Sequence, residues 1–184
     1  GTSYAQGLVL KRALDDSGLS VDEIAHIDLY SCFPIAVTAA CEHLGIDPES
    51  GKALTLTGGL PYFGGPGNNY SLHGIAEVVG RVQKAPGEHG LVAANGGYLS
   101  KHSVGVYSGR LDGEWQVRTS AAERAEAKRA GEKVVIAEEA SGAARIETYA
   151  AVYAKGERSG GYIVGRLGAD DRRFLAVMEP GSST

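Results

Sequence analysis

Apolar residues recur at two different spacings, and the change of spacing divides the chain. Up to about residue 109, apolar positions three and four apart alternate with short apolar runs, which predicts helices alternating with buried strands. After Gly142 the apolar and polar positions alternate with a period of two, which predicts strands only. The pattern therefore predicts a layered α/β part with a mixed sheet, followed by a small all-β part.

The first part begins with a predicted helix from about Tyr4 to Asp16, which Ser17 and Gly18 end. Residues 20–23 read as a cap that starts a single turn. Pro34 suits the first position of a helix. The further predicted helices cover residues 34–44 and about 70–83, and the predicted strands cover 26–30, 55–57, 90–94 and 104–107.

A loop rich in glycine and proline, residues 58–67, joins the predicted strand at 55–57 to the third helix. Asn68 or Asn69 is placed as the N-cap of that helix. Glycines allow a group to approach the backbone closely, and a helix N-terminus presents unpaired N–H groups. The loop is a candidate site for a carbonyl oxygen, a phosphate or a carboxylate, and the alternative is that it only turns the chain. The apolar face of the helix is expected to hold Leu72, Ile75, Val79 and Val82.

The composition changes near Asp112, where a stretch rich in Ala, Glu, Arg and Lys begins. Residues 120–123 resemble a capping box that opens a short exposed helix. Strands are expected at about 143–153, 160–166 and 173–178, and a disordered tail at 180–184. We therefore expect three parts, at residues 1–112, 113–142 and 143–184, with the last a small β-barrel or open sheet.

The composition is that of an ordinary soluble globular protein of one or two domains. The net charge of −4 argues against non-specific binding to nucleic acid or to an anionic membrane. Two cysteines without a paired framework favour a reducing, cytoplasmic setting. The sequence predicts no membrane span and no signal peptide. Because it opens on Gly1 rather than methionine, it is expected to be a fragment of a longer protein.

The order of these features resembles the C-terminal half of a thiolase. The motifs that carry the resemblance are Tyr30-Ser31-Cys32-Phe33 after a strand, Gly64-Gly65-Pro66 before a helix, and Asn95-Gly96-Gly97 after a strand. The resemblance covers Tyr4 to Gly109 and is closest to the sterol-carrier-type branch, often labelled acetyl-CoA acetyltransferase. The all-β part resembles the additional C-terminal domain of type 1 thiolase-like proteins, which is similar to an oligonucleotide/oligosaccharide-binding (OB) barrel.

The resemblance implies an acyl-CoA substrate in lipid metabolism and no separate cofactor or metal. It also implies an absent N-terminal half, which in the family carries the nucleophilic cysteine. The family has Asn-Glu-Ala-Phe or His-Asp-Cys-Phe at residues 30–33, and Gly-His-Pro at residues 64–66. Gly65 thus replaces the catalytic histidine, and Ala94 or Asn95 replaces a cysteine. Since a glycine transfers no proton, and a lost general base costs about 10²–10⁴-fold in rate, thiolytic activity is not expected.

Five side chains are candidates for proton transfer in a different reaction, such as retro-aldol cleavage of an acyl-CoA. Each also has a structural alternative, as a packed or surface residue. They are Tyr30, Cys32, His73, Tyr98 and His102. The residues expected to line a substrate site are Gly64, Gly65, Pro66, Asn68, Asn69, Asn95, Gly96 and Gly97. The remaining histidines, His26, His43 and His89, lack metal-ligand spacing.

Three classes of function remain open: an enzyme subunit with altered chemistry, a non-catalytic acyl-CoA-binding protein, and a nucleic-acid binder that acts through the all-β part. From residue 143 onward six basic residues stand against five acidic ones, so the positive groove of a single-strand binder is not expected. Packing between domains or onto a protein partner is favoured for that part. Half of a thiolase fold also exposes a face that normally packs on the other half, so self-association is possible.

Overall fold

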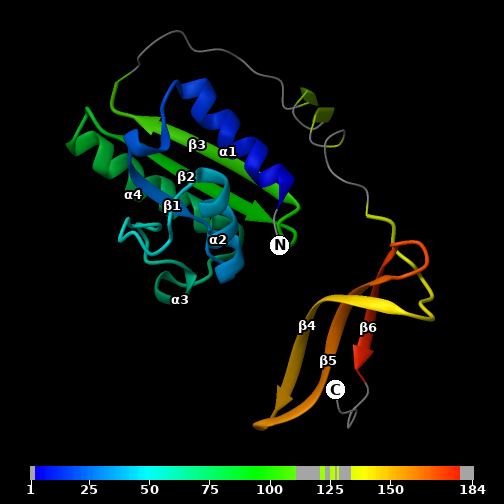
Figure 1. The fold of residues 1–184 in the computed structure, drawn as a ribbon. Coiled ribbons are helices and arrows are strands. Elements are labelled where there is room, and N and C mark those ends of the chain that lie inside the picture. Colours follow the sequence, from blue (N-terminus) through cyan, green and yellow to red (C-terminus); the bar gives the residue numbers. More distant parts are fainter. Residues whose placement is uncertain (1–2, 111–120, 123–124, 127, 129–133, 179–184) are drawn as a thin grey trace. The chain divides into compact units, whose positions relative to one another are not determined.

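A computed structural model describes residues 3–110, 121–122, 125–126, 128 and 134–178 (Figure 1). The chain divides into two compact units, Gly1–Gly131 and Glu132–Thr184. Ser120 and Glu123, on which the predicted capping box rests, lie outside the described residues, as does the tail at 180–184.

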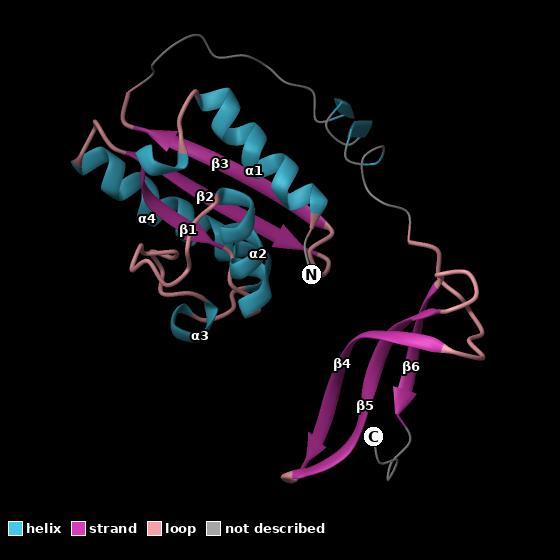
Figure 2. Cartoon of the chain, viewed as in Figure 1, coloured by secondary structure: helices cyan, strands magenta, loops and turns pink. Residues whose placement is uncertain are grey.

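The first unit is a three-layer α/β arrangement around a three-stranded sheet (Figure 2). Strand β1 (Ile24–Leu29) pairs in parallel with β2 (His89–Gly96), which pairs antiparallel with β3 (Lys101–Ser108). Helices α1 (Tyr4–Ser17) and α2 (Pro34–Leu44) pack on one face of the sheet, and α4 (Tyr70–Lys84) packs on the other. The predicted mixed sheet with helices is therefore confirmed.

Local capping sets the ends of these helices, as the sequence predicts. Ser3 Oγ accepts a hydrogen bond from Gln6 N at 3.4 Å and so caps α1. Gly18 and Gly45 end α1 and α2 in the left-handed conformation that glycine adopts without strain, with φ of 68° at each. The turn η1 (Val21–Glu23) is closed by Ser20 N, which donates to the Glu23 carboxylate at 2.9 Å.

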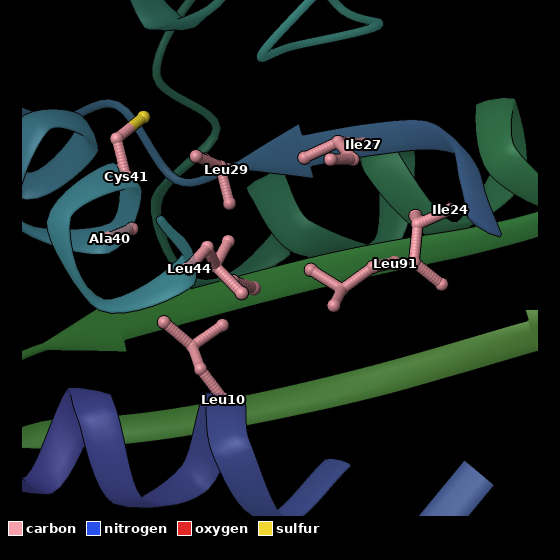
Figure 3. Close-up of a cluster of buried hydrophobic side chains, with 9 residues drawn as sticks. Leu10, Ile24, Ile27, Leu29, Ala40, Cys41, Leu44 and Leu91 are labelled. Atoms are coloured by element: carbon pink, nitrogen blue, oxygen red, sulfur yellow. The ribbon is translucent and has the colours of Figure 1, made fainter. Parts of the chain in front are cut away.

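The larger core lies between the sheet and helices α1 and α2 (Figure 3). Successive strand residues point to opposite faces, so Ile27 and Leu29 of β1 face this core together with Leu91 of β2. The helices contribute leucines at helical spacing and the small side chains of α2. The cluster consists of Leu10, Ile24, Ile27, Leu29, Ala40, Cys41, Leu44, Leu91 and Ala93.

The face of α4 that packs on the sheet matches the predicted one only in part, because Val82 is buried and Ile75 packs against the cluster of Val78, Val82 and Val92, whereas Leu72 does not. Leu72 is 60% exposed, and the buried row is Tyr70, Gly74, Val78 and Val82, at intervals of four residues. Gly74 selects this row because it lies against the buried Asp28 of β1, where a Cβ would come within 2.8 Å of Asp28 Oδ1. Hydrophobicity alone favoured Leu72, whereas the closest approach of helix and sheet required the glycine.

The expected strand at 55–57 is wrong. Its backbone donors are taken by the Asp28 carboxylate, because Leu56 N and Thr57 N donate to Oδ2 at 2.8 and 3.1 Å. Only Leu54 O accepts a bond from β1, from Leu29 N at 2.9 Å. The segment therefore runs alongside β1 without joining the sheet.

Two short helical turns interrupt the predicted loop, α3 (Leu60–Phe63) and η2 (Gly67–Asn69). Asn69 precedes α4, but its side chain does not cap the helix. Instead, its Nδ2 lies 3.2 Å from Nε2 of His73. Asn69 therefore occupies the predicted N-cap position of α4, but it does not form the side-chain hydrogen bond expected of a cap.

The second unit contains an antiparallel sheet in the order β4 (Ala144–Ala154), β5 (Glu157–Leu167) and β6 (Arg173–Met178), so its three predicted strands are confirmed. Within residues 134–178 the sheet is open, with β4 and β6 at its edges, and it does not close into a barrel. The OB-like barrel remains a prediction. Glu147 lies at an irregularity in the β4–β5 register and accepts from Arg166 Nε and Arg173 Nε at 2.8 and 2.6 Å.

A pair of glycine substitutions in α4 tests how the helix lies on the sheet. Gly74→Ala is expected to destabilise the first unit by about 1–3 kcal/mol, the usual cost of overpacking, because its Cβ meets Asp28. Gly80→Ala, at a position where a Cβ meets nothing within 4 Å, is expected to stabilise it by about 0.5–1 kcal/mol. Urea unfolding followed by the circular dichroism of the helices measures both, and equal effects would contradict the packing.

Because two arginines bond to Glu147, we expect the stability of the second unit to depend on pH. Hydrogen bonds from Arg173 and Arg166 lower the pKa of Glu147 from 4.5 to about 2. Because the folded-state pKa is depressed, the stabilisation is present above pH 4.5 and is lost as the pH falls toward 2. The melting temperature of Glu147→Gln should lie below that of the unchanged protein at pH 7, and the gap should narrow between pH 4.5 and 2. Glu157→Gln, at the exposed start of β5, is the control, and a gap that stays constant down to pH 2 would refute the account.

Candidate functional site

Two of the three motifs meet at the carboxyl ends of β1 and β2. Because these strands are parallel, both ends lie at the same edge of the sheet, the edge at which open α/β sheets bind ligands. Tyr30 N donates to Ala93 O at 3.0 Å, which carries the first motif across to β2. Cys32 Sγ then lies 3.7 Å from Asn95 Oδ1 of the second motif.

The glycine-rich segment is fastened to the same edge by a hydroxyl of the first motif. Ser31 Oγ accepts from Leu60 N at 3.2 Å, at the start of α3. Gly59 is required beside it, because it has a φ of 83° and a Cβ there would lie 2.9 Å from Ser31 Oγ. Further along, Thr57 Oγ1 and Tyr70 OH form a hydrogen bond of 2.6 Å. Three segments that are distant in the sequence are thus held together by specific contacts.

An aromatic row runs along this site. The rings of Tyr30 and Tyr70 pack edge to face, with centroids 5.3 Å apart, and Phe63 packs on Tyr70 in the same manner at 6.0 Å. Phe63 also contacts the ring of His73 at 4.8 Å. Burial raises the pKa of Tyr30, with smaller contributions from Cys32 and Tyr70. The Tyr30 hydroxyl therefore keeps its proton at neutral pH, which leaves it able to donate a hydrogen bond and unsuited to act as a base.

The structure brings Tyr30, Cys32 and Asn95 together, but it gives Cys32 no histidine partner among the described residues. His73 is occupied with Asn69 and the ring of Phe63. His102 pairs with Asn95 across β2 and β3. Its Nε2 lies 2.9 Å from Leu99 O, which only accepts, so this nitrogen acts as a donor there rather than as an acceptor. A hydrogen-bonded base is one way in which a protein turns a thiol into a nucleophile, and neither of these two histidines is hydrogen-bonded to Cys32.

The residues of the glycine loop lie on the open rim of the site. Gly64, Gly65, Pro66, Asn68 and Asn69 are all exposed. At Gly65, where the family has its histidine, a Cβ would meet only Leu60 Cδ2, at 4.0 Å. The backbone there has room for a side chain, so the glycine is not a steric requirement.

The turn from β2 to β3 presents Tyr98 to solvent. Tyr98 is 97% exposed, so it has no packing role among the described residues. Tyr98 and Leu99 both have positive φ, 53° and 63°, a conformation that non-glycine residues rarely adopt. The strained turn is held from outside, because Ser3 Oγ donates to Leu99 O at 3.0 Å. Gly96 is half-buried at the end of β2, and Gly97 is exposed in the turn.

Three buried residues of the site were missed from the sequence. Asp28 is 1% exposed and anchors the segment before the glycine loop, and Tyr70 is equally buried and joins that segment to α4. Gln6 of α1 is 5% exposed and reaches Ala36 O of α2. One signal was available: Asp28 is a lone acid between apolar residues of a strand that was predicted to be buried.

The part of the chain that the structure describes contains no group of three or more His, Cys, Asp or Glu side chains arranged to hold a metal ion. Among the same residues, no helix combines the length and the apolar character needed to cross a bilayer.

Comparisons with known proteins agree with this architecture. Residues 125–183 match the model of the "thiolase-like protein type 1 additional C-terminal domain". The structure is similar to a crystal structure of a monomeric SCP2-thiolase-like protein type 1 from Mycobacterium smegmatis, with a TM-score of 0.86 and 46% identity. The match covers 96% of this chain and 39% of that chain, so this chain spans well under half of the related protein. A search among curated proteins returned no match.

The family match covers the second unit, and the structural match extends over almost the entire chain. The motifs that suggested the resemblance lie together at one edge of the first sheet. The chain belongs to the thiolase-like proteins.

Proposed function

We propose that this chain forms part of a site that binds a coenzyme A thioester and does not cleave it by thiolysis. The observation that carries the proposal is that the motif loops are assembled, while two of their positions lack the catalytic side chains of the family. Ser31 and Cys32 still fasten the loops to one another, while Gly65 and Asn95 supply no base or thiol. The fold of the site is retained and the catalytic groups are not, as happens when one fold serves different functions.

The geometry supports binding in three ways. The rim at Gly64–Gly65–Pro66 is exposed; Gly64 N already donates to Leu60 O and Pro66 has no N–H, so the rim offers Gly65 N as its donor to a carbonyl or phosphate oxygen. Tyr30, kept protonated by burial, donates a hydrogen bond to a thioester oxygen. The exposed rings of Tyr62 and Phe63 offer apolar area beside these donors, which suits an acyl chain.

The same geometry argues against the enzyme alternative. Cys32 faces an amide oxygen of Asn95, which accepts a hydrogen bond but does not remove the proton. Retro-aldol cleavage needs a base near the substrate hydroxyl, and the two candidate histidines, His73 and His102, are directed to Asn69, Leu99 and Ser3. A reaction would require groups from outside this chain.

A matched pair of glycine variants tests the proposal in the longer protein that contains this chain. Gly65→Leu places a side chain on the rim without strain, and is expected to weaken acyl-CoA binding by about tenfold or more, equal to about 1.4 kcal/mol. Gly87→Leu is the control. A Cβ at Gly87 meets nothing within 4 Å, and the residue precedes β2, at the opposite edge of the sheet from the motif loops. Calorimetric titration with acetyl-CoA and a long-chain 3-hydroxyacyl-CoA gives the affinities.

Mass spectrometry of the same mixtures, with free CoA added to 3-ketoacyl-CoA, detects turnover. Thiolytic products would refute the claim that Gly65 and Asn95 leave the site without its chemistry. Loss of affinity in both glycine variants, or in neither, would show that the rim is not the binding site. Absence of binding to the unchanged protein would remove coenzyme A from the account.

The second unit supports a different role, contact with protein rather than with nucleic acid. Three of its arginines are paired with acidic side chains: Arg166 and Arg173 share Glu147, and Arg172 pairs with Asp170 at 2.6 Å. A groove for a nucleic-acid backbone needs unpaired positive charge. Large apolar side chains are exposed instead, among them Tyr149 on one face of the sheet and Val177 on the other. Exposed apolar area of this kind is typical of surfaces that contact protein.

A further inference from the structure

A small cavity lies behind the motif loops, between α1, α2 and the sheet. Its volume is about 10 Å³, close to the space that one water molecule needs. Most of its wall is aliphatic, from residues such as Val9, Leu29 and Val104. Four polar side chains complete it, Gln6, Tyr30, Asn95 and His102. The cavity is therefore of the right size and polarity for water rather than for a metal or an organic ligand.

Gln6 supplies the polar group that requires an occupant. The residue is 5% exposed, and its Nε2 donates to Ala36 O at 3.2 Å. This bond fixes the orientation of the amide, because a flipped side chain would set two oxygens against each other. Oε1 has no hydrogen-bond partner among the described residues. A buried acceptor without a partner costs about 1–3 kcal/mol, so such atoms are almost always satisfied by water.

Asn95 supplies the second contact. Its Oδ1 accepts from Cys32 Sγ, which leaves the two hydrogens of Nδ2 available. Water both donates and accepts, so a single molecule satisfies an amide oxygen on one side and an amide N–H on the other. No described side chain could replace it, because Gln6 Oε1 lacks a direct protein donor.

We propose that this cavity is a binding site for one ordered water molecule, which donates to Gln6 Oε1 and accepts from Nδ2 of Asn95. The water links α1 to the second motif and holds the Asn95 amide in the orientation that faces Cys32. Gln6 is then a positioning residue: it acts on Cys32 through the water and Asn95, and touches no ligand itself. The water site is independent of what the motif loops bind.

A crystal structure of the unmodified chain, at a resolution that shows ordered water, tests the site directly. The expected result is a water oxygen about 2.7–3.2 Å from both Gln6 Oε1 and Asn95 Nδ2. An empty cavity, or a side chain that fills it, overturns the proposal. This measurement stands even if a variant fails to fold.

The positioning role is tested by alkylation of the two cysteines with iodoacetamide, followed residue by residue by mass spectrometry. In Gln6→Leu, a leucine of similar size replaces the glutamine and removes the acceptor, so the water should be lost. Cys32 should then react about two- to tenfold faster, which is the ratio that corresponds to the net free energy of one hydrogen bond. Val9→Ala, which changes the same cavity wall and keeps the acceptor, should leave the Cys32 rate unchanged.

Cys41 separates positioning from general loosening. It is 1% exposed in α2, and burial raises the pKa of its thiol, so it should stay unreactive in every variant. If Cys41 and Cys32 accelerate together in Gln6→Leu, the residue is merely structural and the positioning claim fails. An unchanged Cys32 rate in Gln6→Leu refutes it as well.

Discussion

The buried carboxylate of Asp28 is the interaction on which the first unit depends. A charge that is 1% exposed persists only if its oxygens are hydrogen-bonded, and Oδ2 accepts from Leu56 N, Thr57 N and Thr57 Oγ1. Those bonds fix the segment that leads into the glycine loop, and Thr57 passes the constraint on to Tyr70 of α4. The carboxylate therefore sets the position of both the loop and the helix beside it.

This arrangement explains how the loops can keep their positions when the side chain at position 65 changes. The contacts that assemble the motif loops come from backbone groups, a serine hydroxyl, the Cys32–Asn95 pair and aromatic rings, and none of them involves position 65. A change of side chain at this exposed rim position therefore leaves the framework intact. In this chain the contacts that hold the loops together are separate from position 65, so a sequence change there need not disturb the fold.

The sequence predicted what depends on local periodicity and capping. The helix ends at Gly18 and Gly45 and the three strands of the second sheet follow from short-range rules, and the structure has them. The errors arose where a distant residue takes the hydrogen bonds of a segment. The β-branched composition of residues 55–57 predicted a strand, but it does not reveal that Asp28 accepts from the N–H groups of Leu56 and Thr57. Within the candidate site, the motifs located Tyr30, Cys32 and Asn95, whereas Gln6 was hidden because nothing in a helix pattern marks a glutamine that faces inward.

The open edge of β4 has a consequence for how the polypeptide is made. Eleven exposed residues, rich in alanine, tyrosine and β-branched side chains, present backbone groups that no described strand pairs. Such an edge readily recruits another chain. Because the second unit follows the first in the sequence, it leaves the ribosome after residues 3–110 have emerged and had time to fold. The order of synthesis therefore makes this edge one of the last described parts of the chain to emerge, which shortens the time in which it can pair with the same edge of a chain on a neighbouring ribosome.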